Sequence, residues 1–335
     1  MPYLTESYTT TTNMEGSSTT SSQPMLSLRS TKSLANGEIT SIAMSRASPA
    51  AALATYTRGP LRQSWIDMFH LSSGRSISKI EGDRAFYSPS GTRIATLHEA
   101  ATRFGAGTGH THQCNIVIRA VDNGKAQLEI RGVNDGPLVW SPDGSLIAAT
   151  EDANRVGIWD TRVGLRVGRV VTHIDTVTHI AFTQSNNIVT LSRDGTLRVT
   201  DPQTSRTLQR LEIEGQAASN PRFLAVSPNG NTILSVWGTM VQVWSPQTNH
   251  ITAYSLSAVR STEGWPLAAT PDARFLALWT ETGFDVIDVM TGATVFENNG
   301  GALVTSGSFG ENGSVLMLGR MDGTVETYNV KLTRK

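Results

Sequence analysis

The feature that most restricts the fold is a set of turn sequences that recurs along the chain at a nearly constant interval. Six four-residue turns, among them "SPSG", "SPDG" and "SPNG", begin at Ser88, Ser141, Thr183, Ser227, Thr270 and Gly310, with spacings of 53, 42, 44, 43 and 40 residues. A second series of turn residues, at Gly74, Gly124, Gly164, Ser205, Asn249 and Gly292, has spacings of 50, 40, 41, 44 and 43. Two independent series with one period indicate an internal repeat of about 43 residues.

Short apolar and β-branched runs lie between these turns, such as "SLIAAT", "VGIWD", "NIVTLS" and "MVQVW". Runs of about five residues bounded by turn residues predict strands and not helices. Each repeat therefore holds four short strands. Four-stranded units repeated around an axis form a β-propeller, in which sheet edges are short and protected.

The number of blades follows from the innermost strand of each unit. The apolar pattern places seven such strands at Ile39 to Met44, Arg84 to Tyr87, Pro137 to Trp140, Val177 to Phe182, Phe223 to Val226, Pro266 to Ala269 and Val304 to Phe309. The last unit ends after "TVETYNV" without a fourth strand, and "MLSLRSTKSL" from Met25 to Leu34 can supply it. We therefore expect an all-β, seven-bladed β-propeller of four-stranded antiparallel blades over residues 25–335, closed by an N-terminal strand.

Residues 1–24 are rich in Ser and Thr, contain Glu6 and Glu15, and have neither Lys nor Arg nor an apolar stretch. Such a segment lacks the features of a signal peptide and has too little apolar surface to offset the entropy of ordering. We expect it to be a disordered tail. No apolar run elsewhere approaches the roughly 18 residues of a membrane helix, so no membrane association is predicted.

Cysteine content and net charge exclude further classes. Cys114 is the only cysteine, so no internal disulfide is possible and a reducing compartment, cytoplasmic or nuclear, is expected. The 28 basic and 28 acidic residues balance, which removes the electrostatic signature of a nucleic-acid-binding protein.

Two segments carry a family resemblance. "SPDGSLIAATEDANRVGIWDTRVG" resembles a Trp-Asp (WD) repeat, with Trp159 and Asp160 ending its third strand, and "THIDTVTHIAFTQSNNIVTLSRDGTLRVTD" resembles the next repeat. The resemblance covers about residues 36–335 and implies a β-propeller whose ring is closed by pairing of its two ends. Only Trp159–Asp160 keeps the dipeptide; its counterparts are Phe69–His70, Ala120–Val121, Thr200–Asp201, Trp244–Ser245, Ile287–Asp288 and Tyr328–Asn329.

The same resemblance implies a buried network of His, Ser, Asp and Trp within a blade. The fourth blade keeps it best, as His173, Ser192 and Asp194, with Thr200 where Trp would stand. Because a buried polar network must be satisfied internally to stabilise a fold, we interpret these three residues as structural and not catalytic.

The antiparallel order of the strands places loops on two ends of the ring. Loops that join the second to the third strand share an end with the links between blades, and the "SPDG"-type turns lie at the other end. The stretch "GHTHQC" falls in an insertion, "EAATRFGAGTGHTHQC", between the second and third strands of blade 2, and blade 1 has the long loop "YTRGPLRQSW" at the same place. Insertions on one face of a repeat array often mark its binding face. We therefore predict a partner-binding rim made of Arg58, Arg62, Trp65, Arg103, His110 and His112, with Trp265 across the same face.

Metal binding is the alternative interpretation of "GHTHQC". His110, His112 and Cys114 are suitable zinc ligands, but the only local candidates for a fourth ligand are His98 and Glu99. Cys114 is expected to pack between blades as a small apolar residue. We therefore predict neither a metal nor another cofactor.

Three tryptophans lie near the same end of the ring. Trp237 and Trp279 occupy matching positions 42 residues apart, at the ends of second strands, and Trp265 enters an inner strand. We expect Trp237 and Trp279 to pack between blades. Trp265 is open to either packing or partner contact.

Three functions remain. A non-catalytic interaction scaffold or adaptor is favoured because no reaction centre is evident. The propeller module of a hydrolase assembly would need a catalytic domain, and no Gly-x-Ser-x-Gly elbow is present. A ligand receptor or enzyme with a site in the central channel would need convergent acids, yet the acids show no repeated spacing. The sequence thus predicts a protein that is not an enzyme and binds other proteins or peptides as a monomeric propeller within a complex.

Overall fold

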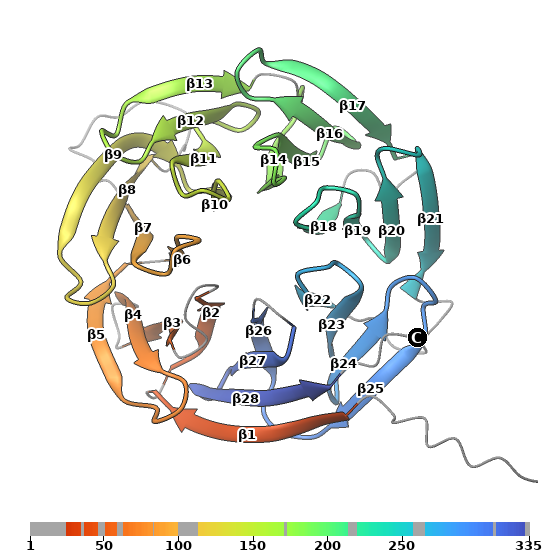
Figure 1. Cartoon of the computed structure of the whole chain (residues 1–335). Coiled ribbons are helices and arrows are strands. Elements are labelled where there is room, and N and C mark those ends of the chain that lie inside the picture. Colours follow the sequence, from red (N-terminus) through yellow and green to blue (C-terminus); the bar gives the residue numbers. More distant parts are fainter. Residues whose placement is uncertain are drawn as a thin grey trace, which may run out of the picture.

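The computed structural model describes residues 25–34, 37–45, 51–58, 63–82, 84–99, 113–170, 173–213, 220–256, 265–310 and 313–331. These residues form seven antiparallel sheets of four strands each, arranged around a central axis (Figure 1). The predicted seven-bladed propeller is confirmed. The tail predicted over residues 1–24 lies outside the described residues.

Each blade runs outward from an inner strand at the axis to an outer strand at the rim. Blade 1 consists of β2 (Ile39–Met44), β3 (Ala51–Arg58), β4 (Gln63–His70) and β5 (Ser76–Glu81). Blade 2 consists of β6 (Arg84–Tyr87), β7 (Arg93–Glu99), β8 (Gln113–Ala120) and β9 (Ala126–Asn134). Blade 3 consists of β10 (Leu138–Trp140), β11 (Leu146–Thr150), β12 (Val156–Asp160) and β13 (Arg166–Val170). Blades 4 and 5 consist of β14 (Val177–Phe182), β15 (Ile188–Ser192), β16 (Thr196–Asp201) and β17 (Arg206–Glu212); and β18 (Pro221–Val226), β19 (Ile233–Trp237), β20 (Met240–Ser245) and β21 (His250–Ser255). Blades 6 and 7 consist of β22 (Trp265–Ala269), β23 (Phe275–Thr280), β24 (Gly283–Asp288) and β25 (Thr294–Asn299); and β26 (Val304–Phe309), β27 (Val315–Arg320), β28 (Thr324–Lys331) and β1 (Met25–Ser33).

The two turn series of the sequence are positions where the backbone takes a positive φ. The fourth residue of the turn between first and second strands has φ between 58° and 71°, at Gly91, Gly144, Asn186, Gly230, Ala273 and Gly313. The second series has φ between 51° and 72°, at Gly74, Gly124, Gly164, Ser205, Asn249 and Gly292. Because glycine and asparagine enter this left-handed region at the lowest cost, the repeat is visible in the sequence through its turns.

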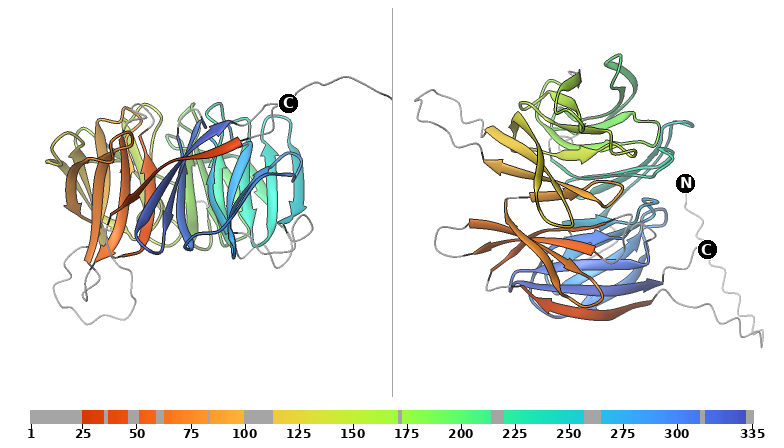
Figure 2. Two further views of the ribbon diagram at one scale, coloured as in Figure 1. Left: turned by 90° about the horizontal axis from the view of Figure 1, so that it is seen from below. Right: turned by 60° about the vertical axis from the view of Figure 1, so that its left-hand side comes forward.

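The ring is closed by the N-terminal strand. β1 pairs antiparallel with β28, from Met25 opposite Lys331 to Ser33 opposite Thr324. The amide of Leu34 continues the contact by donating to the carbonyl of Gly323, 3.0 Å away. The side view in Figure 2 shows the two segments adjacent at the rim. The predicted closure is therefore confirmed, and it makes the last blade a composite of both ends of the propeller.

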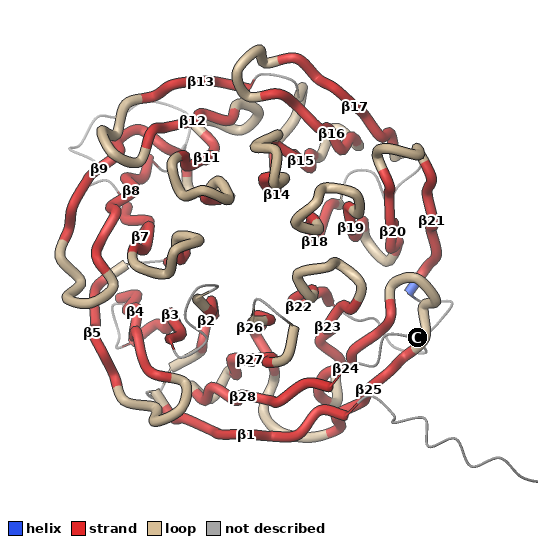
Figure 3. Tube along the Cα trace, viewed as in Figure 1, coloured by secondary structure: helices blue, strands red, loops and turns tan. Residues whose placement is uncertain are grey.

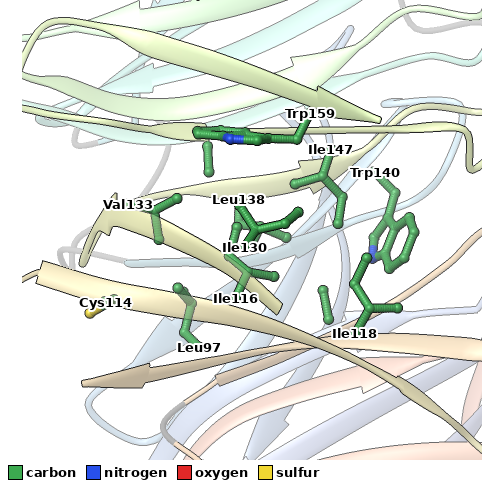
Figure 4. Packing of buried hydrophobic residues seen from close by; sticks show 12 residues of the cluster. Leu97, Cys114, Ile116, Ile118, Ile130, Val133, Leu138, Trp140, Ile147 and Trp159 are labelled. Atoms are coloured by element: carbon green, nitrogen blue, oxygen red, sulfur yellow. The ribbon is translucent and has the colours of Figure 1, made fainter. Parts of the chain in front are cut away.

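The core lies between blades. In the cluster drawn in Figure 4, Leu97, Cys114 and Ile116 of blade 2 pack against Trp140 and Trp159 of blade 3. All of these side chains are buried. The predicted packing role of Cys114 is confirmed.

Nearly all of the regular structure is strand (Figure 3). Within the described ranges the only helical position is Leu256, directly after β21. None of those ranges holds a helix long and apolar enough to cross a membrane.

Candidate protein-interaction face

The two ends of the ring are formed by different kinds of connections between strands. We call the end formed by the links between blades and by the loops between second and third strands the link face; it includes residues 135–137, 151–155, 173–176, 300–303 and 321–323. We call the opposite end, formed by the first-to-second and third-to-fourth turns, the turn face. Any surface particular to this chain is easier to build on the link face, because the turn face is held to short turns of fixed geometry.

Large apolar side chains are exposed on the link face. Ile174 is 88% exposed in the link before blade 4, and Trp265, Leu303 and Met321 are 47%, 41% and 54% exposed on blades 6 and 7. The amide of Met321 donates to the carbonyl of Leu303, 2.9 Å away, so these two residues are neighbours. On the described part of the turn face, Val163, Leu165 and Met290 are also exposed, at 58%, 67% and 51%, but Met290 lies on blade 6, apart from the other two on blade 3. We call Trp265, Leu303 and Met321 the apolar patch; exposed apolar groups that cluster in this way are typical of binding surfaces.

Arg222 stacks on the exposed tryptophan of this patch. Its guanidinium carbon lies 3.8 Å from the centre of the Trp265 ring, within the range of a cation–π contact. The two residues come from the inner strands β18 and β22 of neighbouring blades. The Nε and Nη1 atoms of Arg222 are buried and have no hydrogen-bond partner in the described structure. A cation is thus held at the mouth of the channel with donors unused.

A pocket of about 490 Å³ lies beside β18, the strand that carries Arg222, and extends over blades 2 to 5. Its lining includes Arg84, Asp135, Asp152, His179 and Leu224. Arg84 is occupied within the wall, since it forms an ion pair with Asp135 and donates to the carbonyl of Gly136.

His179 forms the part of the pocket wall nearest to Arg222. Burial lowers the pKa of His179 to about 4, although a hydrogen bond with the backbone of Arg222 opposes the shift. The imidazole is therefore neutral at pH 7. The pocket thus adjoins the strand that carries the unpaired cation.

The structure places the sequence-predicted rim residues unevenly. Arg62, Arg103, His110 and His112 lie outside the described residues. Arg58 ends β3, opposite Gln63 of β4. Trp65 is half-buried and packs against the cluster between blades 7 and 1.

The loop between the second and third strands of blade 1 is shorter than the sequence predicts. "YTRGPLRQSW" was expected to be loop throughout, yet Tyr56 pairs with Trp65 and the ladder continues to Arg58 and Gln63. Only residues 59–62 lie between the two strands. The correction has a physical reason: Tyr56 is 2% exposed and Trp65 half-buried, so their packing extends the hairpin beyond the point where turn residues begin.

The insertion in blade 2 does lie between its second and third strands. β7 ends at Glu99 and β8 begins at Gln113, and residues 100–112 between them lie outside the described residues. Cys114 is already inside the strand, opposite Glu99 and Val133. Among the described residues no group of three His, Cys, Asp or Glu side chains is placed to hold a metal ion.

Trp237 and Trp279 differ from Trp265 in their surroundings. Trp237 is fully buried in the cluster of blades 4 and 5, and its Nε1 donates to the Ser235 hydroxyl at 3.0 Å. Trp279 packs against the cluster of blades 6 and 7 and is partly buried. The predicted packing roles of these two residues are confirmed, and Trp265 is the tryptophan of the three that stands exposed.

A hydrogen-bonded network lies inside blade 4. His173 contacts Asp194 through Nδ1 at 2.9 Å and Thr190 through Nε2 at 2.7 Å. The hydroxyl of Thr190, and not that of Ser192, is therefore the one bonded to the imidazole. Ser192 instead donates to the carbonyl of Asp175 at 3.0 Å and accepts from the amide of Asp194 at 3.1 Å. Thr200 has a buried hydroxyl without a partner in the described structure.

The pKa shifts of His173 and Asp194 determine the protonation state of each residue in this network. Burial lowers the pKa of His173, and the Asp194 carboxylate only partly offsets it. Burial tends to raise the pKa of Asp194, but hydrogen bonds from Thr196 and His173 outweigh it and hold the pKa below its usual range. A neutral imidazole therefore donates a hydrogen bond from Nδ1 to the ionised Asp194 carboxylate and accepts one at Nε2 from the Thr190 hydroxyl. The side chains of His173 and Asp194 are each 1% exposed, which leaves no access for a substrate.

Comparison with known proteins agrees with this architecture. The model of the WD domain, G-beta repeat, matches residues 165–201, which run from the start of β13 to the end of β16. The Periodic tryptophan protein 2 homolog of Caenorhabditis elegans is 30% identical over 115 residues, which are 33% of this chain and 12% of that protein. This chain is thus similar to a small part of a much longer relative. With a matched WD repeat over residues 165–201, seven four-stranded blades and a ring closed by its N-terminal strand, the chain is a seven-bladed β-propeller that contains a WD repeat.

Proposed function

We propose that this chain is a non-catalytic scaffold or adaptor that binds other proteins or peptides through its link face. The observation that carries the proposal is the grouping of exposed Trp265, Leu303 and Met321 on that face, next to Arg222, whose buried Nε and Nη1 atoms have no hydrogen-bond partner in the described structure. Aromatic and arginine side chains supply much of the binding energy in protein interfaces. A rigid ring presents them without a cost in ordering the backbone.

The polar residues predicted from the sequence extend this surface. Arg58, Arg62, Arg103, His110 and His112 belong, in this proposal, to the rim of blades 1 and 2, and Trp265 to the opposite side of the same face. The family usually lacks catalytic activity, and we assign His173, Ser192 and Asp194 a structural role because their hydrogen bonds are made inside blade 4. No metal or cofactor is part of the proposal, and the expected location is the cytoplasm or nucleus.

The pocket favours one second candidate. A volume of about 490 Å³ at the channel mouth is within the usual size range of small-molecule sites, so the alternative function is a ligand receptor with a site in the channel. The scaffold is preferred because the exposed apolar side chains lie outside the pocket, where a small ligand would not cover them.

Charge reversal on each face tests the proposal. The triple variant Arg58→Glu, Arg62→Glu, Arg103→Glu should lose the proteins that co-purify with the chain from cells, with an unchanged melting temperature. The matched control Arg75→Glu, Arg162→Glu, Arg206→Glu changes the same charge on exposed turn-face positions and should retain them. Loss of partners in the control alone would place the binding surface on the turn face and refute the proposal.

A further inference from the structure

Arg222 occupies a β-bulge position of the inner strand at which blades 1, 4 and 7 have threonine. In blades 1, 4, 5 and 7 the inner strand has a β-bulge one residue inside its link-face end, at Thr40, Thr178, Arg222 and Thr305. The hydroxyls of Thr40 and Thr178 donate to a carbonyl of the adjacent second strand, at distances of 3.3 and 3.2 Å. The Thr305 hydroxyl has two acceptors in reach, the carbonyl of Gly319 in its own second strand at 3.1 Å and the carbonyl of Ile39 in blade 1 at 2.5 Å. Threonine at this position therefore has a backbone acceptor for its hydroxyl in each of these blades.

Blade 5 departs from that pattern in a way that leaves donors unused. The side chain of Arg222 crosses to blade 6 and stacks on Trp265. Its Nε and Nη1 atoms are buried without a hydrogen-bond partner in the described structure. Buried donors of a cation that make no hydrogen bond are costly, whereas the threonine found in blades 1, 4 and 7 would carry no such cost. The cost is explained if the guanidinium is kept for a ligand.

We propose that Arg222 and Trp265 form the anchor for an acidic peptide segment of a partner protein, with a carboxylate bound to Arg222. This inference rests on the proposed function and names the partner's chemistry. The planar guanidinium has two edges with parallel N–H groups, Nε with Nη2 and Nη1 with Nη2, and either edge matches a carboxylate. Leu303 and Met321 supply apolar contacts on one side and the pocket around His179 and Leu224 supplies them on the other. The segment therefore carries apolar residues next to its acidic one.

Binding requires a side-chain movement at the anchor. Nε and Nη1 are covered in the unbound chain and lie on different edges of the guanidinium, so the carboxylate reaches one of these edges only after part of its cover is displaced. The ring of Trp265 lies over the guanidinium and is 47% exposed, so it can turn toward solvent. Its fluorescence should change when a peptide binds.

The matched variant for the test is Arg222→Thr. Threonine at this bulge can bond the carbonyl of Val236, which is the counterpart of the carbonyls bonded in blades 1, 4 and 7. The variant should therefore fold with an unchanged or higher melting temperature. Arg193→Thr removes a cation from an exposed loop between the second and third strands of blade 4 and controls for general electrostatic attraction.

The probe is a short capped peptide of alternating Glu and Leu, titrated against the full chain and followed by tryptophan fluorescence and calorimetry. We expect salt-sensitive binding that weakens by about tenfold or more in Arg222→Thr, the range for a charge-assisted hydrogen bond, and is unchanged in Arg193→Thr. A matching Gln and Leu peptide should not bind. Equal binding by Arg222→Thr, equal loss in Arg193→Thr, or binding only of a phosphoserine version of the peptide would overturn the assignment.

The same variants separate this inference from the proposed function. If wild-type protein binds no acidic peptide, yet the Arg58, Arg62 and Arg103 charge reversal still removes its partners, then the anchor is refuted and the link-face scaffold stands. If Arg222→Thr loses the peptide while both charge-reversal triples keep all partners, then the anchor stands and the proposed rim is refuted.

Discussion

Closure of the ring by β1 can be tested with two leucines of the same strand. Leu26 is 7% exposed and packs with Phe284, Leu316 and Tyr328 between blades 6 and 7, whereas Leu28 is 55% exposed. Truncation of a buried leucine to alanine costs about 2–5 kcal/mol. We expect about 2–3 kcal/mol for Leu26→Ala, because the site lies at the rim, where neighbours can relax into the space.

The expected change in melting temperature follows from the size of the chain. At about 2–4 °C per kcal/mol for domains of this order, Leu26→Ala should lower the midpoint by roughly 4–12 °C in differential scanning calorimetry. Leu28→Ala removes the same atoms from a half-exposed position and should change stability by less than about 0.5 kcal/mol. Equal effects of the two substitutions would refute the docked strand, since an undocked segment gives both leucines the same surroundings.

Three further predictions concern closure, turns and pH. Deletion of residues 1–34 should expose the edge of β28 and lower the melting temperature or solubility, whereas deletion of residues 1–22 should change neither; equal stability of the two truncations would contradict the closure. Gly144 has φ of +70° and room for a methyl group, so Gly144→Ala should cost about 1–2 kcal/mol through the backbone alone in chemical denaturation, and no change would argue against the left-handed turn. Burial lowers the pKa of His179 to about 4, below its unfolded value, so the neutral form stabilises the fold at pH 7 and a contribution of ~3 kcal/mol is lost as pH falls from about 6.5 through 4. His179→Asn should flatten the fall of the melting temperature over this range, and an unchanged pH profile would show that His179 is not buried.

The parts of the fold that were predictable are those set by local chemistry. The inner strands Ile39–Met44, Arg84–Tyr87, Val177–Phe182 and Val304–Phe309 have the predicted bounds. They are bounded by turns whose positive φ demands particular residues, so the turn sequence marks the end of the strand. Where the turn signal was weaker, as before Phe223, the strand begins two residues earlier, at Pro221.

The parts that were not predictable depend on contacts between distant residues. Pairing of Tyr56 with Trp65 is decided by burial against blades 7 and 1, which the segment "YTRGPLRQSW" does not reveal. Exposure of Leu303 and Met321 could not be read from apolar residues that elsewhere belong to the core. Strand order could have indicated their exposure, since both residues lie in connections on the link face.

The candidate site shows the same division. Trp265 was placed on the correct end of the ring by strand order alone. Its contact with Arg222 depends on how neighbouring blades are registered, and no local pattern encodes that relation. Thr190 was likewise overlooked beside Ser192, because both hydroxyls lie on β15 and only the direction of each side chain separates their partners.

The most direct test of the link face as the binding surface is site-specific photo-crosslinking in cells. The crosslinking residue p-benzoylphenylalanine replaces Ile174 or Met321 on the link face, or Val163 or Met290 on the turn face, all of which are 51% exposed or more. We predict crosslinked partners from the two link-face positions and none from the turn-face positions. Partners captured from Val163 and Met290, with none from Ile174 and Met321, would contradict a link-face binding surface.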